Sequence, residues 1–132
     1  MVTLPLSHLV AKFSLDGQMY EIERFKIGFS QDIDHKGQPE HETVGGKMFI
    51  TITQAADNNL YLWAKKSTLL KSGQVLFQTD LGMTVLEIDF VNAYCINLTR
   101  DINAYTGTTT SLILSPEKVV MNGKSHENAW KK

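Results

Sequence analysis

The stretch Thr84–Arg100, TVLEIDFVNAYCINLTR, alternates apolar and polar residues over almost its whole length. A period of two is that of a β-strand with one buried face, because successive side chains of a strand point to opposite sides of its sheet. About fifteen residues is roughly three times the usual strand length. We therefore expect a strand that either bends to serve two sheets or extends beyond its own subunit. Its apolar set keeps one phase, with Asn92 as the single lapse: Leu86, Ile88, Phe90, Tyr94, Ile96 and Leu98.

Shorter alternating runs precede this stretch. Ala11–Asp16, AKFSLD, fits a half-buried strand, and Asp16-Gly17 favours the tight turn of a β-hairpin. Within Gln18–Gln31, QMYEIERFKIGFSQ, the alternation breaks, which predicts a β-bulge near Glu23–Arg24. Lys47–Gln54, KMFITITQ, is rich in β-branched residues and alternates again. This half of the chain is therefore predicted to be almost entirely β.

One segment has the spacing of a helix. It is Asp57–Leu70, DNNLYLWAKKSTLL, and Asp57 or Asn58 at its start can accept hydrogen bonds from unpaired backbone N–H groups as an N-cap. Leu60 and Trp63 fall on one face of this helix. A tryptophan at such spacing is more often a core anchor than a platform for a ligand, so we expect both side chains to anchor the helix in the core.

The remaining segments complete a mainly β chain. Gly73–Asp80 is a further strand, and the C-terminal part predicts a strand pair around Pro116. Asn103–Thr110, NAYTGTTT, is polar and uncharged and is expected to be a flexible or interfacial loop. Seven or eight strands with one helix predict a barrel or sandwich with a single packed helix. A chain of 132 residues without repeats or linkers is expected to form one domain.

The most polar segment is 32–46, DIDHKGQPEHETVGG, which separates two strand-like runs. It starts like the calcium loop D-x-[DN]-x-[DN]-G, with Asp32, Asp34 and a glycine in place. Lys36, however, stands where the third oxygen ligand is required, and Thr43 stands where the bidentate glutamate is required. The flanking runs are also strands rather than helices. Calcium binding is therefore not expected.

A zinc or iron site is the second candidate in this segment, with His35 and His41 joined by Glu40 or Glu42. Two histidines one helical turn apart can hold one metal ion, but these are six residues apart in a segment with glycine and proline. The other two histidines lie near the chain ends. We therefore expect neither a metal nor any other cofactor.

Catalytic patterns are not found either. The sequence has no G-x-S-x-G elbow and no glycine-rich phosphate loop. Cys95 lies in an apolar run and is expected to be a buried structural thiol. The carboxylate pairs Glu21/Glu23 and Glu87/Asp89 are two residues apart, so each pair shares one face of a strand, either as a solvated face or as an acidic strip that meets a basic partner.

Bulk composition excludes further classes. Thirteen basic and fourteen acidic residues leave a net charge of −1, with no basic cluster of the kind that nucleic-acid binding needs. No apolar run approaches the roughly 20 residues of a membrane span. The N-terminus has no basic region followed by an uninterrupted apolar one, so it does not predict a secretory signal, and we expect the protein to fold in the cytoplasm.

The segment 32–46 is better explained as a contact loop. Gly37-Gln38-Pro39 supplies a turn, and Gly45-Gly46 allows a sharp bend or the close approach of another chain. The loop is longer than the two to five residues usual in a hairpin, and such loops in compact domains are commonly functional. We expect it to become ordered by contact with a neighbouring molecule.

Taken in order, these segments resemble the tube protein of type VI secretion systems, Hcp or TssD, in the form found in Bacteroidetes. No single piece is a strong motif, and the ordered set is what is specific, over roughly Leu9 to Trp130. The matching pieces are LDGQMYEI (15–22), SQDIDHKGQPEHETVGGKMFITI (30–52), LYLWAKK (60–66), LEIDFVNAYCINL (86–98) and LILSPEKVVMNGKSHENAW (112–130).

The resemblance implies a small two-sheet β-barrel with one packed helix, an architecture shared with phage tail tubes. Six copies would close into a ring, and rings would stack into a hollow tube that a contractile sheath drives out of the cell with tip and effector proteins. It implies no catalysis, no nucleic acid and no membrane insertion. The protein would stay in the cytoplasm until firing and leave through the apparatus without a signal peptide. Residues 1–7 would be an additional N-terminal lead-in.

The resemblance also implies that the loop after the second strand reaches a neighbouring subunit or the next ring. The alternative function is that of a monomeric small-molecule-binding β-barrel, with Trp63 and strand aromatics lining a cavity. Twelve aromatic residues are few for that purpose. The residues expected at the contact between rings or subunits are Asp32, Asp34, His35, Lys36, Gly37, Gln38, Pro39, Glu40, His41, Gly45 and Gly46.

Overall fold

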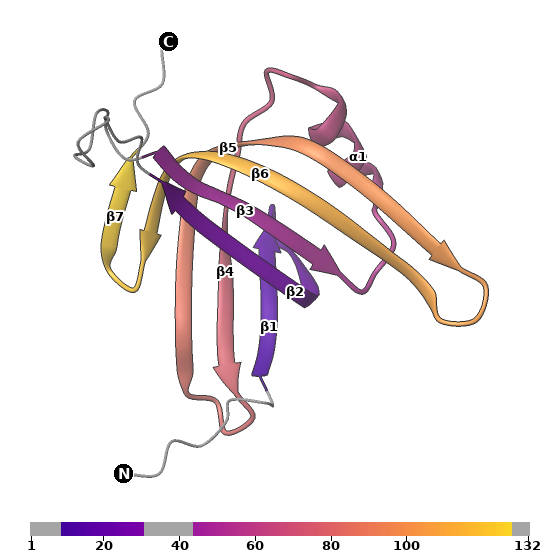
Figure 1. Ribbon diagram of the computed structural model, residues 1–132, viewed down its shortest axis with the longest axis horizontal. Coiled ribbons are helices and arrows are strands. Elements are labelled where there is room, and N and C mark those ends of the chain that lie inside the picture. The colour runs from indigo at the N-terminus through magenta and orange to yellow at the C-terminus, as the bar shows by residue number, and fades with distance from the viewer. Residues whose placement is uncertain (1–8, 31–43, 128–132) are drawn as a thin grey trace, which may run out of the picture.

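The computed structural model describes residues 9–30 and 44–127 (Figure 1). This part of the chain forms seven strands and one helix, as the apolar periodicity predicts. The elements are β1 (Leu9–Leu15), β2 (Gln18–Ser30), β3 (Val44–Ile52), α1 (Asn58–Lys65), β4 (Lys71–Thr79), β5 (Thr84–Asn103), β6 (Gly107–Met121) and β7 (Lys124–Glu127).

All strand pairs are antiparallel, in the order β3-β2-β1-β4-β5-β6-β7, and β3 also pairs with β6. That additional pairing closes a ring of six strands, with β7 added to β6 as a hairpin. In Figure 1 the strands lie along two axes. The strands β1, β4 and the first half of β5 are aligned with one another, and β2, β3 and the long β5–β6 hairpin cross them. The predicted two-sheet barrel with one packed helix is therefore confirmed.

The long strand bends, as one of its two sequence interpretations requires. Its first half pairs with β4 through Ala93, whereas residues 94–103 pair only with β6 within the described part of the chain. Asn92 marks the bend, with a left-handed backbone (φ 51°) that asparagine adopts more readily than most residues. Its backbone N–H donates to the Ser72 hydroxyl, and its side-chain amide donates to the Glu117 carboxylate.

The prediction of a single apolar phase through β5 is wrong directly after this bend, at Tyr94 and Ile96, and holds again at Leu98, which packs against the core. Ile88 and Phe90 are buried, but the next buried residues are Ala93 and Cys95, so the inward set moves by one position at Asn92. One extra residue transfers the side chains after it to the other face, until a second extra residue restores the phase. A second register shift between Cys95 and Asn97 leaves Ile96 52% exposed.

The turns agree with the sequence except near the C-terminus. Asp16 and Gly17 both have positive φ and form the β1–β2 turn, and the register shift between Ile22 and Arg24 is the predicted bulge. Pro116, however, does not divide a strand pair, because β6 continues through it.

The last hairpin instead turns at Asn122 and Gly123, both with positive φ. The segment Asn103–Thr110 is also less of a loop than expected, because the strands reach Asn103 on one side and begin at Gly107 on the other.

The helix begins where the sequence predicts. The Asp57 carboxylate accepts from the Leu60 backbone N–H at 3.0 Å, which makes Asp57 the N-cap. Leu60 and Trp63 are fully buried, and the Trp63 indole N–H donates to the Ala93 carbonyl at 3.0 Å. The helix is therefore fixed to β5 next to the bend.

A polar network joins the start of the helix to the β1–β2 turn. The Lys71 ammonium donates to the Asp16 carboxylate and to the Asn59 side-chain oxygen, and the Asn59 amide also donates to Asp16. These hydrogen bonds, with that of Lys71 the strongest influence, hold the pKa of Asp16 below its ordinary value. Tyr20 donates to Asp57, and burial together with this carboxylate raises the pKa of Tyr20.

The core lies between the two sheets, and α1 closes one side of it. Within the core, Phe13 packs against Tyr20 and Phe90 with ring centroids 5.7 and 6.0 Å apart. Among the described residues, no helix is long and apolar enough to span a membrane. The buried apolar residues are Ala11, Phe13, Leu15, Tyr20, Ile22, Met48, Ile50, Ile52, Leu60, Trp63, Val75, Ile88, Phe90, Ala93, Cys95, Leu112, Leu114 and Val119.

Candidate subunit-contact surfaces

The predicted contact loop begins and ends at the same end of the β2–β3 hairpin. Its strands meet at the pair Ser30 and Val44, so both ends of the loop are fixed at the end of the β2–β3 ladder. Gly45 and Gly46 lie within β3. The other predicted contact residues lie outside the described residues: Asp32, Asp34, His35, Lys36, Gly37, Gln38, Pro39, Glu40 and His41.

Gly46 makes a close approach to its own chain. Its φ is +76°, and a Cβ atom built there would lie 2.8 Å from Val119 Cγ2 and 3.5 Å from Pro116 Cγ. A side chain at this position would therefore push β3 away from β6. Nearby, the Phe29 and His126 rings meet edge to face at 5.0 Å and join the end of β2 to β7. The base of the loop is thus packed against the barrel.

Two long strand edges are left without a strand partner in the described part of the chain, besides the edge of the short terminal strand β7. Residues 22–30 of β2 pair with β3 on one side only, and residues 94–103 of β5 pair with β6 on one side only. The helix α1 lies beside the second edge, where Arg100 Nη1 donates to the Tyr61 hydroxyl at 3.4 Å. Unpaired edges are templates for pairing with another chain.

These edges were not located from the sequence, although a signal exists. Strand β2 has 13 residues against seven in β1, and β5 has 20 against nine in β4. A strand much longer than its neighbour in the sheet must leave part of its edge unpaired. The lengths could be read only after the strand ends and their pairing were known.

The two edges bound one four-stranded sheet, in the order β2, β3, β6 and β5. Its inward side chains belong to the core, for example Phe25, Ile50, Leu112 and Leu98, which lie in one row across the sheet. The other side of this sheet is its outer face. Two rows of side chains cross that face: Arg24-Thr51-Ser111-Thr99 and Lys26-Phe49-Ile113-Asn97.

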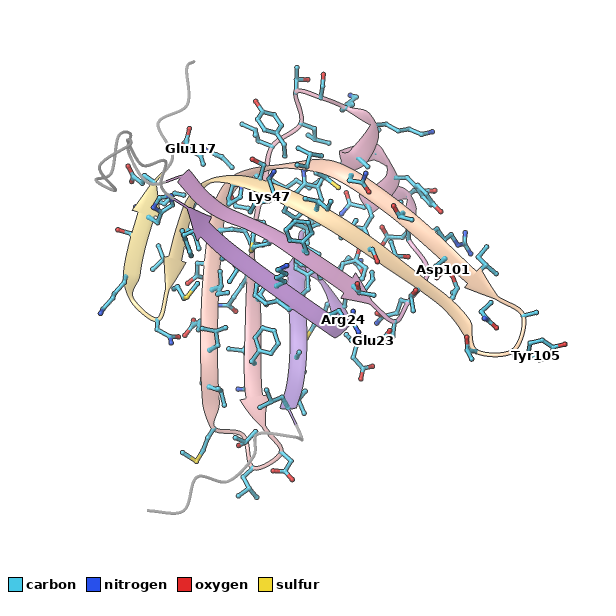
Figure 2. The ribbon with its side chains drawn as sticks, in the orientation of Figure 1. Glu23, Arg24, Lys47, Asp101, Tyr105 and Glu117 are labelled. Carbon is cyan, nitrogen blue, oxygen red and sulfur yellow. The ribbon has the colours of Figure 1, made fainter. Side chains whose placement is uncertain are left out.

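The outer face is polar and open. Its side chains, with those of Lys47, Thr109 and Asp101, are exposed or half-buried, so no other element of the described chain packs on them. The Thr51 and Ser111 hydroxyls share a hydrogen bond of 3.1 Å, and Lys26 Nζ lies 5.9 Å from the centre of the Phe49 ring. Figure 2 shows Arg24, Lys47 and Asp101 along this sheet.

Two carboxylates lie together on the outer face of the opposite sheet. Glu87 and Asp89 lie side by side on β5, and Gln74 Nε2 donates to both carboxylates at 2.8 and 3.1 Å. They follow the solvated face of the strand, as one interpretation of their spacing predicts.

Exposed apolar side chains gather at two hairpin tips. Leu81 and Met83, at the β4–β5 turn, are 87% and 68% exposed. Ile102 and Tyr105, at the β5–β6 turn, are 68% and 98% exposed, and Figure 2 shows Tyr105 at the extreme end of that hairpin. Large apolar side chains gathered at exposed positions commonly mark surfaces that bind protein.

Reactive groups are scarce in the described chain. Burial raises the pKa of the Cys95 thiol to about 11, and its S–H donates to the Asn97 carbonyl, so Cys95 is a structural thiol as predicted. Among residues 9–30 and 44–127, no three His, Cys, Asp or Glu side chains gather as metal ligands. Trp63 is the residue that the small-molecule alternative places in a cavity. It is fully buried in the core, and its indole N–H donates to the Ala93 carbonyl.

Comparisons with known proteins agree with this architecture. The family model of the hemolysin coregulated protein Hcp (TssD) matches residues 7–131. The structure of Hcp1 from Flavobacterium johnsoniae is similar at a TM-score of 0.82 and 23% identity, covering 90% of this chain and 99% of that one. That source is a member of the Bacteroidetes, as the resemblance in sequence predicts.

More distant structures share the fold. Hcp1 from Salmonella typhimurium has a TM-score of 0.72 at 12% identity, covering 90% of this chain and 91% of that one. A chain of the anti-feeding prophage baseplate, from a structure with 6-fold symmetrisation, has a TM-score of 0.57 at 15% identity, covering 93% and 98%. A search of curated proteins found no match.

Proposed function

Because the chain belongs to the Hcp (TssD) family, we propose that it is the structural subunit of the inner tube of a type VI secretion system. Six copies form a ring, and rings stack into a hollow tube that delivers effectors. The family match over residues 7–131 carries this proposal. The two unpaired strand edges support it independently, because they supply a means of joining copies in sequence.

The edges favour a closed ring over a two-fold dimer. They belong to different strands, β2 and β5, so pairing the β2 edge of one copy with the β5 edge of the next leaves one edge of each kind free. Repeating such a heterologous contact generates a ring when the rotation closes and a helical filament when it does not. Ring closure would pair both long edges of every copy, which would also protect the protein from uncontrolled aggregation.

Contacts between rings would use other parts of the molecule. The loop of residues 32–44 is proposed to reach the next ring, since its two ends are fixed together at the end of the β2–β3 ladder. The apolar tip formed by Leu81 and Met83 is a second candidate for this contact. The residues proposed for the loop contact are those expected from the sequence, with Gly46 serving to hold β3 against β6.

The proposed role is mechanical, without catalysis. The partners would be further copies of this chain, the contractile sheath, and the tip and effector proteins of the apparatus. The protein would be held in the cytoplasm until firing and then leave with the tube. None of these steps requires a cofactor, a nucleic acid or insertion into a membrane.

Size-exclusion chromatography with light scattering and negative-stain microscopy tests the proposal. Purified protein at high concentration should contain particles of six times the subunit mass that appear as rings with six-fold symmetry. A monomer at all concentrations, with a small molecule bound in its barrel, would instead establish the alternative function.

A further inference from the structure

We propose that successive copies pair residues 24–30 of β2 with residues 97–103 of β5 in one register, which sets Lys26 of one copy against Asp101 of the next. This inference rests on the proposed tube function and deepens it, because it names the residues that select the neighbouring copy. It is carried by the lengths of the two regular strand runs, by the apolar side chains on their inner side and by the charges of Lys26 and Asp101.

The two edges meet in the antiparallel sense when copies close into a ring. Within one copy, three successive antiparallel pairs lead from β2 to β5, so these two strands point in opposite directions (Figure 1). Rotation about the ring axis leaves the component of a strand direction along that axis unchanged. The β2 strand of one copy therefore runs antiparallel to the β5 strand of the next, as neighbours within the sheet already do.

The two faces of the sheet restrict the register. In an antiparallel pair, residues directly opposite each other project to the same face. Phe25 and Ile27 of β2 and Leu98 of β5 pack against the core, so they belong to the inner side. Lys26 and Asp101 alternate with these residues and belong to the outer face. A continuous sheet needs outward residues opposite outward residues, which excludes every second register.

Bulges divide both edge strands. The extra residue Glu23 interrupts β2, and the extra residue Ile96 interrupts β5. A third shift, between Gly28 and Phe29, has its extra residue, Gly46, on β3 and leaves β2 itself regular. Each edge strand therefore has one regular run between its bulge and the end of the strand.

The two regular runs have the same length. They cover residues 24–30 and 97–103, seven residues each. The register that sets Arg24 opposite Asn103 pairs all seven, matches the faces and keeps both bulges outside the pairing. A shift by two residues, the next register that the faces allow, would set part of each run against a bulge or beyond the end of the other strand.

Apolar side chains meet on the inner side in this register. Ile102, which is 68% exposed in the isolated subunit, would lie opposite Phe25 of the next copy. Phe29, which is 45% exposed, would lie opposite the half-buried Leu98. Removal of such apolar surface from water favours association. In one of the shifted registers, Ile102 would instead lie opposite the exposed carboxylate of Glu23.

Opposite charges meet on the outer face in the same register. Lys26 and Asp101 are both exposed, and neither forms an ion pair with another described residue of its own copy. Arg24, the other cation of this run, has Glu23 beside it in the bulge. Lys26 is therefore the cation of β2 that is best placed to pair with the next copy. Complementary charges at a boundary suppress wrong partners and fix the register.

This pair of charges does not form within one copy. Lys26 and Asp101 lie on the two outermost strands of the sheet, with β3 and β6 between them. Neighbouring strands are about 4.8 Å apart, so the two residues are separated by roughly 14 Å across the sheet. An ion pair requires a separation of about 4 Å or less. An effect of one charge on the other is therefore an effect between copies.

The ion pair is tested by mixing two variants. Asp101→Lys and Lys26→Glu each set like charges against each other at every boundary, and each should raise the protein concentration at half assembly about tenfold or more. An equimolar mixture should recover rings, because alternating copies restore opposite charges at every boundary. Size-exclusion chromatography with light scattering measures the assembled fraction. Sodium chloride at about 1 M should reduce the difference between the single variants and the mixture.

The matched control is Arg24→Glu, which makes the same change of charge two residues away on the same face. Mixed with Asp101→Lys, it should recover far fewer rings than Lys26→Glu does. Recovery with Arg24→Glu instead of Lys26→Glu, or with neither variant, would overturn the proposed register. Thermal unfolding of the monomeric variants checks that each one is folded.

Disulfide cross-linking tests the register without changing a charge. The register sets Thr99 opposite Gly28, where an added Cβ atom would meet nothing within 4 Å. Oxidised Thr99→Cys/Gly28→Cys should therefore give a ladder of linked chains on a non-reducing gel, whereas Thr99→Cys/Lys26→Cys, the pair of a shifted register, should give little. Unsubstituted protein, with buried Cys95, gives the background. Preferential linking of the second pair would overturn the register.

The two proposals fail in different ways. Absence of rings in the unsubstituted protein would contradict the tube function itself. Rings that form normally, but show neither recovery in the mixture of charge variants nor the link between positions 99 and 28, would leave the tube function standing and overturn the proposed register.

Discussion

The two halves of β5 are one strand with the same alternating sequence and opposite surroundings. Residues 84–93 pair with β4, those from Ile88 onward also pair with β6 on the other side, and Ile88 and Phe90 are buried completely. Residues 94–103 have a partner on one side only in the described chain and leave Ile96 and Ile102 more than half exposed. The first half therefore completes the fold of the subunit, whereas the second half leaves an unpaired edge and exposed apolar side chains, where we propose that a neighbouring copy binds.

The same substitution in each half of β5 tests this difference, and it should give the largest effect. Ile88→Ala removes a fully buried side chain and should lower the free energy of unfolding by about 2–5 kcal/mol. Ile102→Ala removes a side chain that is 68% exposed and should change the free energy of unfolding of the isolated subunit by less than about 0.5 kcal/mol. Urea denaturation of monomeric protein measures both values.

For ring assembly we expect the opposite order of the two variants. The fraction of protein in rings, measured at a concentration where Ile88→Ala is still folded, should fall more for Ile102→Ala than its stability predicts. Equal stability losses for the two variants would mean that the second half of β5 belongs to the core, and the division of the strand would be wrong.

The next largest effect on the free energy of unfolding is expected at Asn92, where the two halves of β5 meet. Asn92→Val places a β-branched residue at φ 51° and removes the amide that donates to Glu117, which should cost about 1–2 kcal/mol. Asn92→Gly keeps the backbone conformation and loses the side-chain hydrogen bond alone, so it should cost less. Thermal unfolding of both variants compares them, and a valine variant as stable as the glycine variant would show that the left-handed backbone is not what bends the strand.

Much of the fold could be predicted because it depends on neighbours in the sequence. The Asp16-Gly17 turn, the bulge after Ile22 and the Asp57 cap each follow from residue types that favour one local conformation. Pro116 was expected to mark a break, but it lies opposite Ala93 directly after the bend, within a strand that continues through it. Proline is tolerated in a strand at such irregular positions.

The contact surfaces could not be predicted because they depend on distant pairings. The outer face exists only because β3 pairs with β6, for instance Phe49 with Ile113, and no local pattern specifies that partner. The phase change at Asn92 then moves Cys95 inward and Ile96 outward, against the alternation of the sequence.

Acid should weaken the first half selectively through the network beside Ala93. The hydrogen bond from Lys71, which lies opposite Ala93, lowers the folded-state pKa of Asp16 below its unfolded value of 3.8. Asp16 therefore contributes stability that is fully present above that value and is lost as the pH falls through the lower, folded-state pKa. Urea midpoints at pH 7 and at pH 2.5 to 3.5 should fall less in Asp16→Asn than in the unsubstituted protein.

Lys71→Met is the companion variant, since it removes the same interaction from the other side. It should reproduce the reduced acid sensitivity of Asp16→Asn. If the unsubstituted protein and both variants lost stability in parallel, the acid response would come from other carboxylates, and the network would not support the first half of β5 through its charge.

The smallest effect on the subunit is expected from the loop that the sequence singles out. Deleting residues 35–41 should leave the thermal unfolding of the isolated subunit unchanged, because the strand ends on either side of the loop are held by the pairing of Phe29 with Gly45 and by the contact of Phe29 with His126. Stacking of rings should weaken, as measured by light scattering and microscopy. A collapse of subunit stability would make the loop part of the fold, and it would then belong with the first half of β5 rather than with the second.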